Sequence, residues 1–240
     1  MGMTELRKGI ENPLAVVSTI NAITDFLGEQ GNSIVMSTDM KLFQDVRQTA
    51  RSARTSPMFD HEITQLEGKS FWLGLKNESG DYVAFQACRL DLVDTSLAEW
   101  AVGWMSGLYM KRDMLMVPSK LEPFPSSKAY RISGRIVYHG ELWLEPSPLR
   151  GSGIASAFCF LGMVLAHLKW QPDAIWALVS NRMATSGHPI RFGYPTIERS
   201  FLNWAWSPDD VPGNEWLLLA DFDDMERLTS EYAEVGPIVK

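Results

Sequence analysis

The stretch LEPSPLRGSGIASAF, Leu144–Phe158, decides the fold because it joins a strand-like segment to a long apolar segment through small residues. Gly151 and Gly153 can adopt backbone conformations that are closed to other residues, and Ala155 adds little bulk to the helical turn that follows. The first amides of a helix lack partners within it and carry partial positive charge. The stretch therefore predicts a turn where a phosphate or pyrophosphate approaches several backbone amides.

The segments around this turn alternate between strand and helix patterns. Residues 131–146, RISGRIVYHGELWLEP, predict one or two strands, and Gly151 to Trp170 predicts an apolar helix. AIWALVS, Ala174–Ser180, is a short apolar run typical of a strand buried on both faces. Two hairpins are predicted, one by SFWLGL and YVAFQACRLDLV between residues 70 and 93, the other by IERSFLNWAW and EWLLLADF between residues 197 and 222.

Helices are expected in the remaining parts of the chain. Asn12-Pro13 opens one that ends near Gly28, and Met40, Phe43 and Val46 recur at helical spacing in a second. In residues 97–110, Trp100 and Trp104 follow helical spacing, and the proline-rich segment 117–130 is either a lid over a binding site or a simple connection. We expect a single mixed α/β domain over residues 1–240, with N-terminal helices in 1–69, a core in 70–228 and an insertion at about 97–130.

Composition limits the classes of partner. The 240 residues carry a net charge of −7 and a pI near 5.2, which argues against a nucleic acid or an anionic membrane as partner. Cys88 and Cys159 lie in apolar surroundings, and the chain starts with no signal-type segment. We therefore expect a cytoplasmic protein with reduced thiols, and no spacing of His, Cys, Asp and Glu predicts a metal site.

The turn fails two well-known phosphate motifs and fits a third. It has no Gly-Lys-Ser/Thr of a P-loop, and it lacks the third glycine of the dinucleotide fingerprint. RGSGIA, residues 150–155, matches Arg/Gln-x-x-Gly-x-Gly/Ala, and with the lead-in LWLEP, residues 142–146, it resembles the Gcn5-related N-acetyltransferase (GNAT) superfamily. In that family the turn holds the pyrophosphate of acetyl-CoA or another acyl-CoA. The preceding strand carries a bulge that opens the sheet.

The resemblance extends beyond the turn. Asn181 and Ala184, followed by RFGY at residues 191–194, resemble the family's Asn-x-x-Ala helix opening and closing Gly-Phe element, and the order of elements over residues 70–222 is similar. It implies an α/β fold with a mixed, mostly antiparallel sheet that is splayed at the motif strand, with helices on both faces. Pro146 lies four residues before Arg150 instead of three, so the register of the strand is open by one residue, and a slip of one residue exchanges its faces.

The function implied by the resemblance is acyl-CoA-dependent N-acyl transfer, with acetyl-CoA or another acyl-CoA as co-substrate and no metal. The acceptor would be a primary amine of a small molecule, which attacks the thioester directly. Whether the protein forms a homodimer is left open. The implied acyl-CoA contacts are Leu142, Leu144, Arg150, Gly151, Ser152, Gly153, Ile154, Ala155 and Asn181. Backbone amides of residues 142–144 would stabilise the oxyanion.

Three residues are candidates for proton transfer. His139 and Glu141 are expected on one face of the motif strand; a histidine titrates near neutral pH unaided, whereas a glutamate needs burial to do so. Each has a plainer interpretation, a hydrogen-bonded strand histidine or a solvated carboxylate. The other register would present Tyr138 and Gly140 instead. The position of the family's catalytic tyrosine falls on Pro189, so the adjacent His188 is either the general acid or an ordinary loop histidine.

Two other classes of function remain open on the sequence. A relative without catalytic activity would keep the CoA turn for sensing or structure, as the missing tyrosine suggests. An interaction protein would use Trp100 and Trp104 in an oligomeric or partner interface. Absence of acyl transfer to amines would favour the relative without catalytic activity over an enzyme. Dissociation of a dimer in Trp104→Asp, with acyl transfer intact, would support the interface role of this helix.

Overall fold

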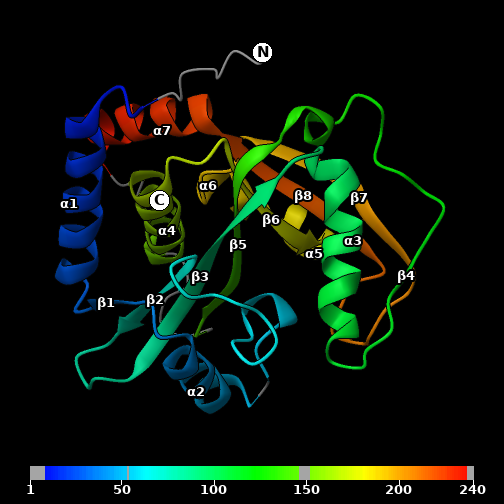
Figure 1. The fold of residues 1–240 in the computed structure, drawn as a ribbon. Helices are drawn as coiled ribbons and strands as arrows, with labels where there is room; N and C mark the ends of the chain where they lie inside the picture. Colours follow the sequence, from blue (N-terminus) through cyan, green and yellow to red (C-terminus); the bar gives the residue numbers. More distant parts are fainter. Residues whose placement is uncertain (1–8, 53, 146–151, 237–240) are drawn as a thin grey trace.

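One twisted sheet organises the molecule in the computed structural model, which describes residues 9–52, 54–145 and 152–236 (Figure 1). Its strand order is β1-β2-β3-β5-β6-β8-β7-β4, and β5 and β6 form the parallel pair while the other neighbours are antiparallel. The strands are β1 (Ser33–Ser37), β2 (Ser70–Lys76), β3 (Tyr82–Val93), β4 (Val117–Pro118), β5 (Gly134–Leu144), β6 (Ala174–Ser180), β7 (Thr196–Trp206) and β8 (Asn214–Asp221). The predicted mixed, mostly antiparallel sheet is confirmed.

Helices cover both faces of the sheet (Figure 1). One core cluster joins α1, α4 and α7 to the sheet, and a second joins α2, α3 and the turn η1. We call these the α4 face and the α3 face. The helices are α1 (Pro13–Glu29), α2 (Met40–Arg51), α3 (Leu97–Met110), α4 (Ile154–Trp170), α5 (Asn181–Ala184), α6 (His188–Arg191) and α7 (Phe222–Val235), with 3₁₀ turns η1 (Pro57–Phe59) and η2 (Lys128–Arg131).

Local sequence explains where the first helices begin. The side chain of Asn12 accepts a hydrogen bond from the amide of Ala15 at 3.1 Å, and Pro13 occupies the first helical position of α1. Asp39 accepts from the amides of Lys41 and Leu42 at the start of α2. Both predicted helices in residues 1–69 are present.

The N-terminal part contains more than the two predicted helices. β1 pairs antiparallel with β2 along its whole length and forms one edge of the sheet. It escapes sequence analysis because SIVMS is short and half-exposed, so its apolar residues show no clear alternation. The N-terminal segment is therefore part of the sheet and not only a helical cover.

The proline-rich segment 117–130 lies away from the centre of the sheet (Figure 1). Its first residues form β4, which pairs with β7, and the amide of Ser119 donates to the carbonyl of Asn203 at 2.8 Å. The segment extends the β7 edge, at the side of the sheet opposite to β1.

β5 and β6 separate after a short parallel pairing, and this separation positions the site. The paired residues run from Ile136 to Tyr138 in β5 and from Ala174 to Trp176 in β6, yet both strands continue beyond them. The edge of β5 that faces β6 therefore has no strand partner from His139 onward within the described residues. The predicted splay at the motif strand is confirmed.

The last helix that the structure describes is α7, which the sequence prediction did not include. A capping box starts it, because Asp221 accepts from the amide of Asp224 and Asp224 accepts from the amide of Asp221. The helix packs on α1 and α4, where the hydroxyl of Thr19 donates to the carbonyl of Thr229 at 2.9 Å.

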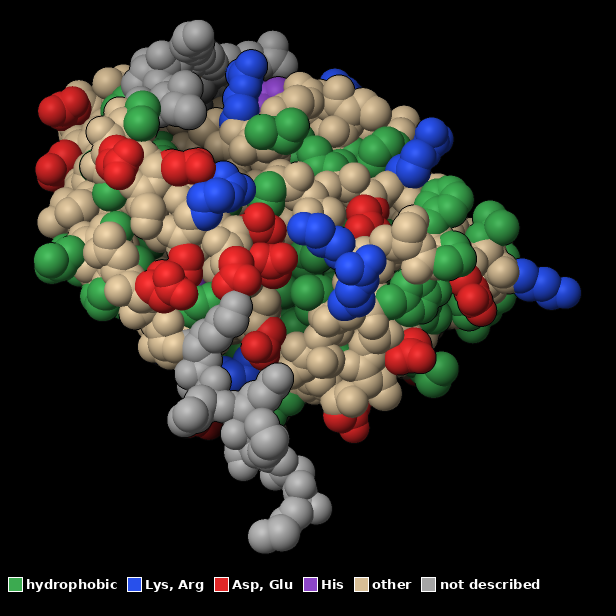
Figure 2. Space-filling model, turned by 90° about the horizontal axis from the view of Figure 1, so that it is seen from above, with side chains coloured by type: hydrophobic (Ala, Val, Ile, Leu, Met, Phe, Trp, Pro, Cys, Tyr) green, Lys and Arg blue, Asp and Glu red, His purple; other side chains and the backbone are tan. Residues whose placement is uncertain are grey.

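The surface seen from above mixes acidic and basic side chains over one face, without a continuous basic patch on that face (Figure 2). Within the described residues, no helix is both long and apolar enough to span a bilayer.

Candidate active site

A cavity of ≈ 330 Å³ opens where β5 and β6 separate. Residues of both strands line it, from Tyr138 to Leu142 in β5 and from Ala177 to Ser180 in β6. The α3 face contributes Met58, Met105, Tyr109, Val211 and Glu215, and the α4 face contributes Cys159, Phe192 and Tyr194. The cavity thus reaches both faces of the sheet through the gap between the two strands.

A β-bulge at Glu141 fixes which side chains reach each face. Gly140 is opposite Ala87 and Trp143 is opposite Phe85, so two residues of β5 face the single residue Gln86, and Glu141 has φ +58°. The extra residue resets the alternation of side chains along the strand. The expectation that His139 and Glu141 share a face is therefore wrong: His139 lies on the α4 face, and Glu141 lies with Tyr138 on the α3 face.

His139 is buried in a chain of hydrogen bonds on the α4 face. Its Nδ1 lies 2.6 Å from the hydroxyl of Tyr194, its Nε2 lies 2.7 Å from Oε1 of Gln86, and its exposed fraction is 3%. Burial lowers the pKa of His139 to about 4. Both ring nitrogens have protein partners and the ring is neutral at pH 7, so its surroundings favour the plainer interpretation of a hydrogen-bonded strand histidine.

Glu141 is held in an ion pair. Its carboxylate accepts from Nε of Arg47 and, at 2.8 Å, from the amide of Ser56, and its side chain is 4% exposed. Arg47 also donates to the carbonyl of Arg54. The carboxylate joins the bulge to α2 and to the segment after it, which is a structural role that the sequence did not indicate.

Glu215, at the start of β8, is the functional candidate that the sequence prediction missed. It lines the cavity with 5% exposure and accepts from the indole Nε1 of Trp204 at 2.8 Å. Burial raises its pKa to about 7, and the hydrogen bond from Trp204 opposes that shift. A signal existed: in EWLLLADF, Glu215 alternates with Leu217 and Leu219, which places a carboxyl on the inward face of a buried strand.

Tyr138 lines the same half of the cavity as Glu215. Its ring stacks on Phe59 with centroids 5.8 Å apart and meets the ring of Trp176 at 4.9 Å. Burial, followed by the negative charge of Glu215, raises the pKa of its hydroxyl well above the usual value. The hydroxyl makes no hydrogen bond with the residues that the structure describes, so its proton is available to a ligand.

The glycine turn leads into α4 beside the cavity. Gly153 has φ +79° and precedes the helix without a side-chain cap, and Ser152 accepts from the amide of Ile154 at 3.3 Å. Ile154 is buried and Ala155 is half-buried at the start of α4. Arg150 and Gly151 lie outside the described residues. Leu142 and Leu144 pack partly against the core of the α4 face, and Leu142 also lines the cavity.

Seven of the predicted site residues that the structure describes do not line the cavity: Leu144, Ser152, Gly153, Ile154, Ala155, Asn181 and His188. Asn181 is exposed at the start of α5, and His188 is exposed at the start of α6 with its Nδ1 2.8 Å from the hydroxyl of Ser186. Tyr194, only six residues after His188, instead reaches the cavity from the segment that follows α6.

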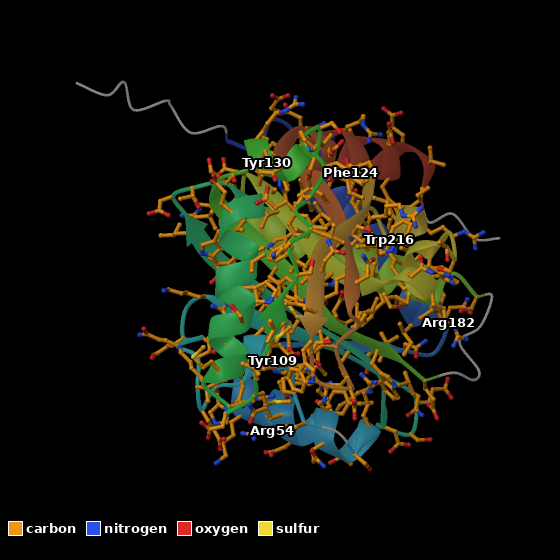
Figure 3. All side chains as sticks on the ribbon, turned by 90° about the vertical axis from the view of Figure 1, so that its right-hand side faces the viewer. Arg54, Tyr109, Phe124, Tyr130, Arg182 and Trp216 are labelled. Carbon is orange, nitrogen blue, oxygen red and sulfur yellow. The ribbon has the colours of Figure 1, made fainter. Side chains whose placement is uncertain are left out.

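The tryptophans of α3 are packing residues for the most part. The rings of Trp100 and Trp104 stack 5.0 Å apart, and Trp104 meets Tyr138 edge to face at 5.1 Å. The helix contributes Met105 and Tyr109 to the cavity instead, whereas the segment 117–130, the candidate lid, contributes no lining residue. Tyr109 lies near the end of α3 that is closer to Arg54 (Figure 3).

The chemistry available to the cavity is acid–base chemistry. Burial raises the pKa of the Cys159 thiol well above the usual range, so it is protonated at neutral pH and a poor nucleophile. Within the described part of the chain, no group of three or more His, Cys, Asp and Glu side chains is arranged to hold a metal ion. The groups that can transfer protons are the carboxyl of Glu215, whose pKa is about 7, and the protonated hydroxyl of Tyr138.

Comparisons with known proteins were made for sequence and for structure. No protein-family model matches the chain, and no curated protein matches its sequence significantly. Its solved structural neighbours include NAA60 of Arabidopsis thaliana with a bisubstrate analogue (14% identity, 79% of this chain and 99% of that chain, TM-score 0.41). Others are a putative acyl-CoA N-acyltransferase of Klebsiella pneumoniae (12%, 80% and 97%, 0.40) and a GNAT superfamily phosphinothricin acetyltransferase of Sinorhizobium meliloti with AcCoA (9%, 80% and 88%, 0.39).

Proposed function

We propose that the protein is an acyl-CoA-dependent N-acyltransferase of the GNAT type, which acetylates a primary amine of a small molecule. The observation that carries the proposal is the cavity between β5 and β6, where Glu215, a buried carboxyl with a pKa of about 7, faces a gap in the sheet. A general base works best when its pKa is close to the operating pH. A cavity of ≈ 330 Å³ suits a small acceptor.

The acyl-CoA would bind along the gap from the α4 face. Its pyrophosphate would approach the amides at Gly153, Ile154 and Ala155, with Ser152 beside them, and Arg150 and Gly151 complete the sequence motif. Gly153 with φ +79° favours such an approach because it brings no side chain into the turn. The free edge of β5 at residues 139–144 would hold the pantetheine arm and donate an amide to the thioester oxygen.

Proton transfer would take place on the α3 face. Glu215 would remove a proton from the ammonium group of the acceptor, and the neutral amine would then attack the thioester carbonyl carbon. The attacking nitrogen is positively charged once the carbon–nitrogen bond has formed, and it would release its second proton to solvent. As the carbon–sulfur bond breaks, Tyr138 would give its proton to the departing thiolate and regain one from solvent. Its raised pKa keeps the hydroxyl protonated until that step.

His139 and Glu141 would act as positioning residues under this proposal. His139 holds Tyr194 and Gln86 beside the gap, and Glu141 holds the bulge against Arg47. His188 and Asn181 have no role in it because both are exposed, and neither lines the cavity or belongs to the glycine turn. A cytoplasmic location stays part of the proposal, and the two buried, free cysteines support it.

Binding of acetyl-CoA tests the first half of the proposal. Titration calorimetry on the intact chain is compared with Gly153→Val and with the matched control Gly187→Val. Gly187 also has a positive φ, +76°, and precedes the short helix α6, so both variants carry similar backbone strain. We expect affinity to be lost in Gly153→Val and kept in Gly187→Val, because the valine side chain would occupy the space of the pyrophosphate.

Acetyl transfer to a panel of primary amines tests the second half. Loss of transfer in Glu215→Gln with acetyl-CoA affinity unchanged would support the enzyme. Absence of acetyl-CoA binding in the wild type would overturn the proposal altogether. Binding without transfer to any amine would instead favour a CoA-binding protein without catalytic activity.

A further inference from the structure

Arg51 supplies a positive charge to the mouth of the cavity. It is the last residue of α2, it lines the cavity, and its side chain is exposed. No hydrogen bond or ion pair joins its guanidinium to the other described residues. One helical turn earlier, Arg47 is buried and paired with Glu141.

The surroundings of Arg51 leave its charge uncompensated. Partial desolvation at the cavity mouth, and then the positive charge of Arg47, lower the pKa of Arg51, while Glu141, which is paired with Arg47, opposes the shift. The charged form of a cation that lies beside another cation at the edge of a cavity is stabilised when an anion approaches both. An arginine fork also suits the planar geometry of a carboxylate or the oxygens of a phosphate.

The anion at Arg51 would not be the pyrophosphate of the acyl-CoA. Arg51 belongs to α2, which packs on the α3 face of the sheet, whereas the glycine turn leads into α4 on the other face (Figure 1). The α3 face is also the face from which the acceptor would enter. The anionic group that Arg51 fits therefore belongs to the acceptor.

Acidic side chains reach the cavity from a different direction. Glu215 comes from β8, and Asp210 comes from the loop between β7 and β8, while Arg51 comes from the end of α2. The α3 face also lines the cavity with Met58, Met105, Tyr109 and Val211. The cavity thus offers a cationic group, an apolar wall and an acidic group to one molecule.

We propose that the acceptor is a primary amine that also carries an anionic group, a carboxylate or a phosphate, which binds at Arg51 while the amine binds at Glu215. The inference rests on the proposed acyl transfer. An apolar body between the two charged ends would contact Met105 and Tyr109. Amino acids are the simplest compounds with this distribution of charge.

The experiment compares acceptors in matched pairs with the 240-residue chain. Each of a set of L-amino acids is measured against its own amide, and phosphoethanolamine is measured against ethanolamine, with acetyl-CoA as donor. The variants are Arg51→Gln, Arg51→Lys and, as a control, Arg182→Gln, an exposed arginine that does not line the cavity. Acetyl-CoA affinity is determined for each variant.

We expect the wild type to prefer the anionic member of at least one pair at least tenfold in kcat/KM. In Arg51→Gln that preference falls to about one, the rate with the neutral member and the acetyl-CoA affinity stay unchanged, and Arg51→Lys keeps part of the preference. Preference for the carboxylate pairs or for the phosphate pair identifies the anion.

Three results would overturn the inference while leaving acyl transfer in place: equal rates within every pair, a preference that survives Arg51→Gln, or an equal loss in Arg182→Gln. Acetylation of no amine by a protein that binds acetyl-CoA would also overturn it. Failure to bind acetyl-CoA would instead overturn the proposed function itself.

Discussion

Tyr194 donates its hydroxyl hydrogen to Nδ1 of His139. The direction of this bond follows from the hydrogen bond that Gln86 makes on the other side of His139. The amide nitrogen of Gln86 donates to the carbonyl of Phe158, which can only accept, so Oε1 of Gln86 must accept from Nε2 of His139. A neutral ring with hydrogen on Nε2 has a bare Nδ1, and the hydroxyl of Tyr194 lies 2.6 Å from it.

This direction separates the two tyrosines that line the cavity. The proton of Tyr194 is committed to His139, so Tyr194 offers a ligand only its oxygen lone pairs. The proton of Tyr138 has no such commitment among the described residues. The structure thus distinguishes an acceptor on the α4 face from a donor on the α3 face.

Removing the Tyr194 hydroxyl should destabilise the protein through His139. In Tyr194→Phe the buried Nδ1 loses its donor, and an unsatisfied buried acceptor costs about 1–3 kcal/mol. Denaturant unfolding measures the loss, with Tyr130→Phe as control because its exposed hydroxyl makes only a 3.4 Å bond to the carbonyl of Pro123. Equal stability of the two variants would contradict the hydrogen-bond chain.

The stability of the protein should depend on the ionisation of Glu215. Its folded-state pKa, about 7, lies above the ordinary value of 4.5, so its contribution to stability is complete below pH 4.5 and is lost as the pH rises through about 7. Glu215→Gln has no carboxyl to ionise and avoids this loss. The free energy of unfolding of the variant minus that of the wild type should therefore increase by up to about 3 kcal/mol between pH 4.5 and 8. A constant difference across that range would show that the carboxyl titrates normally.

The pH profile of acetyl transfer should distinguish Glu215 from His139 as the base. We expect kcat/KM of the wild type to rise with a midpoint near pH 7, since the base must be ionised. His139→Asn should keep this midpoint, whereas Glu215→Gln should lose it together with about a hundredfold or more in rate. The reverse pattern would return the role to His139.

Gly162 in α4 should not tolerate a methyl group. A Cβ there would lie 2.6 Å from Oε1 of Gln86, the atom that accepts from His139. We expect Gly162→Ala to destabilise the protein by about 1–3 kcal/mol through overpacking. Gly107→Ala in α3 meets no atom within 4 Å and should instead stabilise by about 0.5–1 kcal/mol, which makes it a control for helix propensity. Equal effects in thermal unfolding would contradict the close contact.

Much of the fold followed from local patterns. The strands 82–93 and 174–180 and the helix 97–110 have the predicted bounds, because each has a strong period and clear turn residues at its ends. α7 was missed although Asp221 and Asp224 form a capping box and Met225, Leu228 and Tyr232 recur at helical spacing. The preceding strand ends at Asp221, so the boundary was hidden within one apolar run.

The site was harder to predict than the fold because one bulge controls it. No residue type marks Glu141 as a position with positive φ, yet that single residue decides that Tyr138 and Glu141 share a face. Glu215 reaches the cavity only through the pairing of β8 with β6, a contact between segments far apart in sequence. The local alternation in EWLLLADF places Glu215 on an inward face, but it does not reveal which strand lies next to β8.

The gap between β5 and β6 also bears on the order in which the two substrates of the proposed acyl transfer would bind. Because the cavity is lined from both faces of the sheet, two substrates entering from opposite sides need not displace each other. Burial keeps the thiol of Cys159 protonated, which makes it a poor nucleophile for an acylated intermediate. We therefore expect a ternary complex, visible as initial-rate lines that intersect instead of running parallel when one substrate is varied at fixed levels of the other.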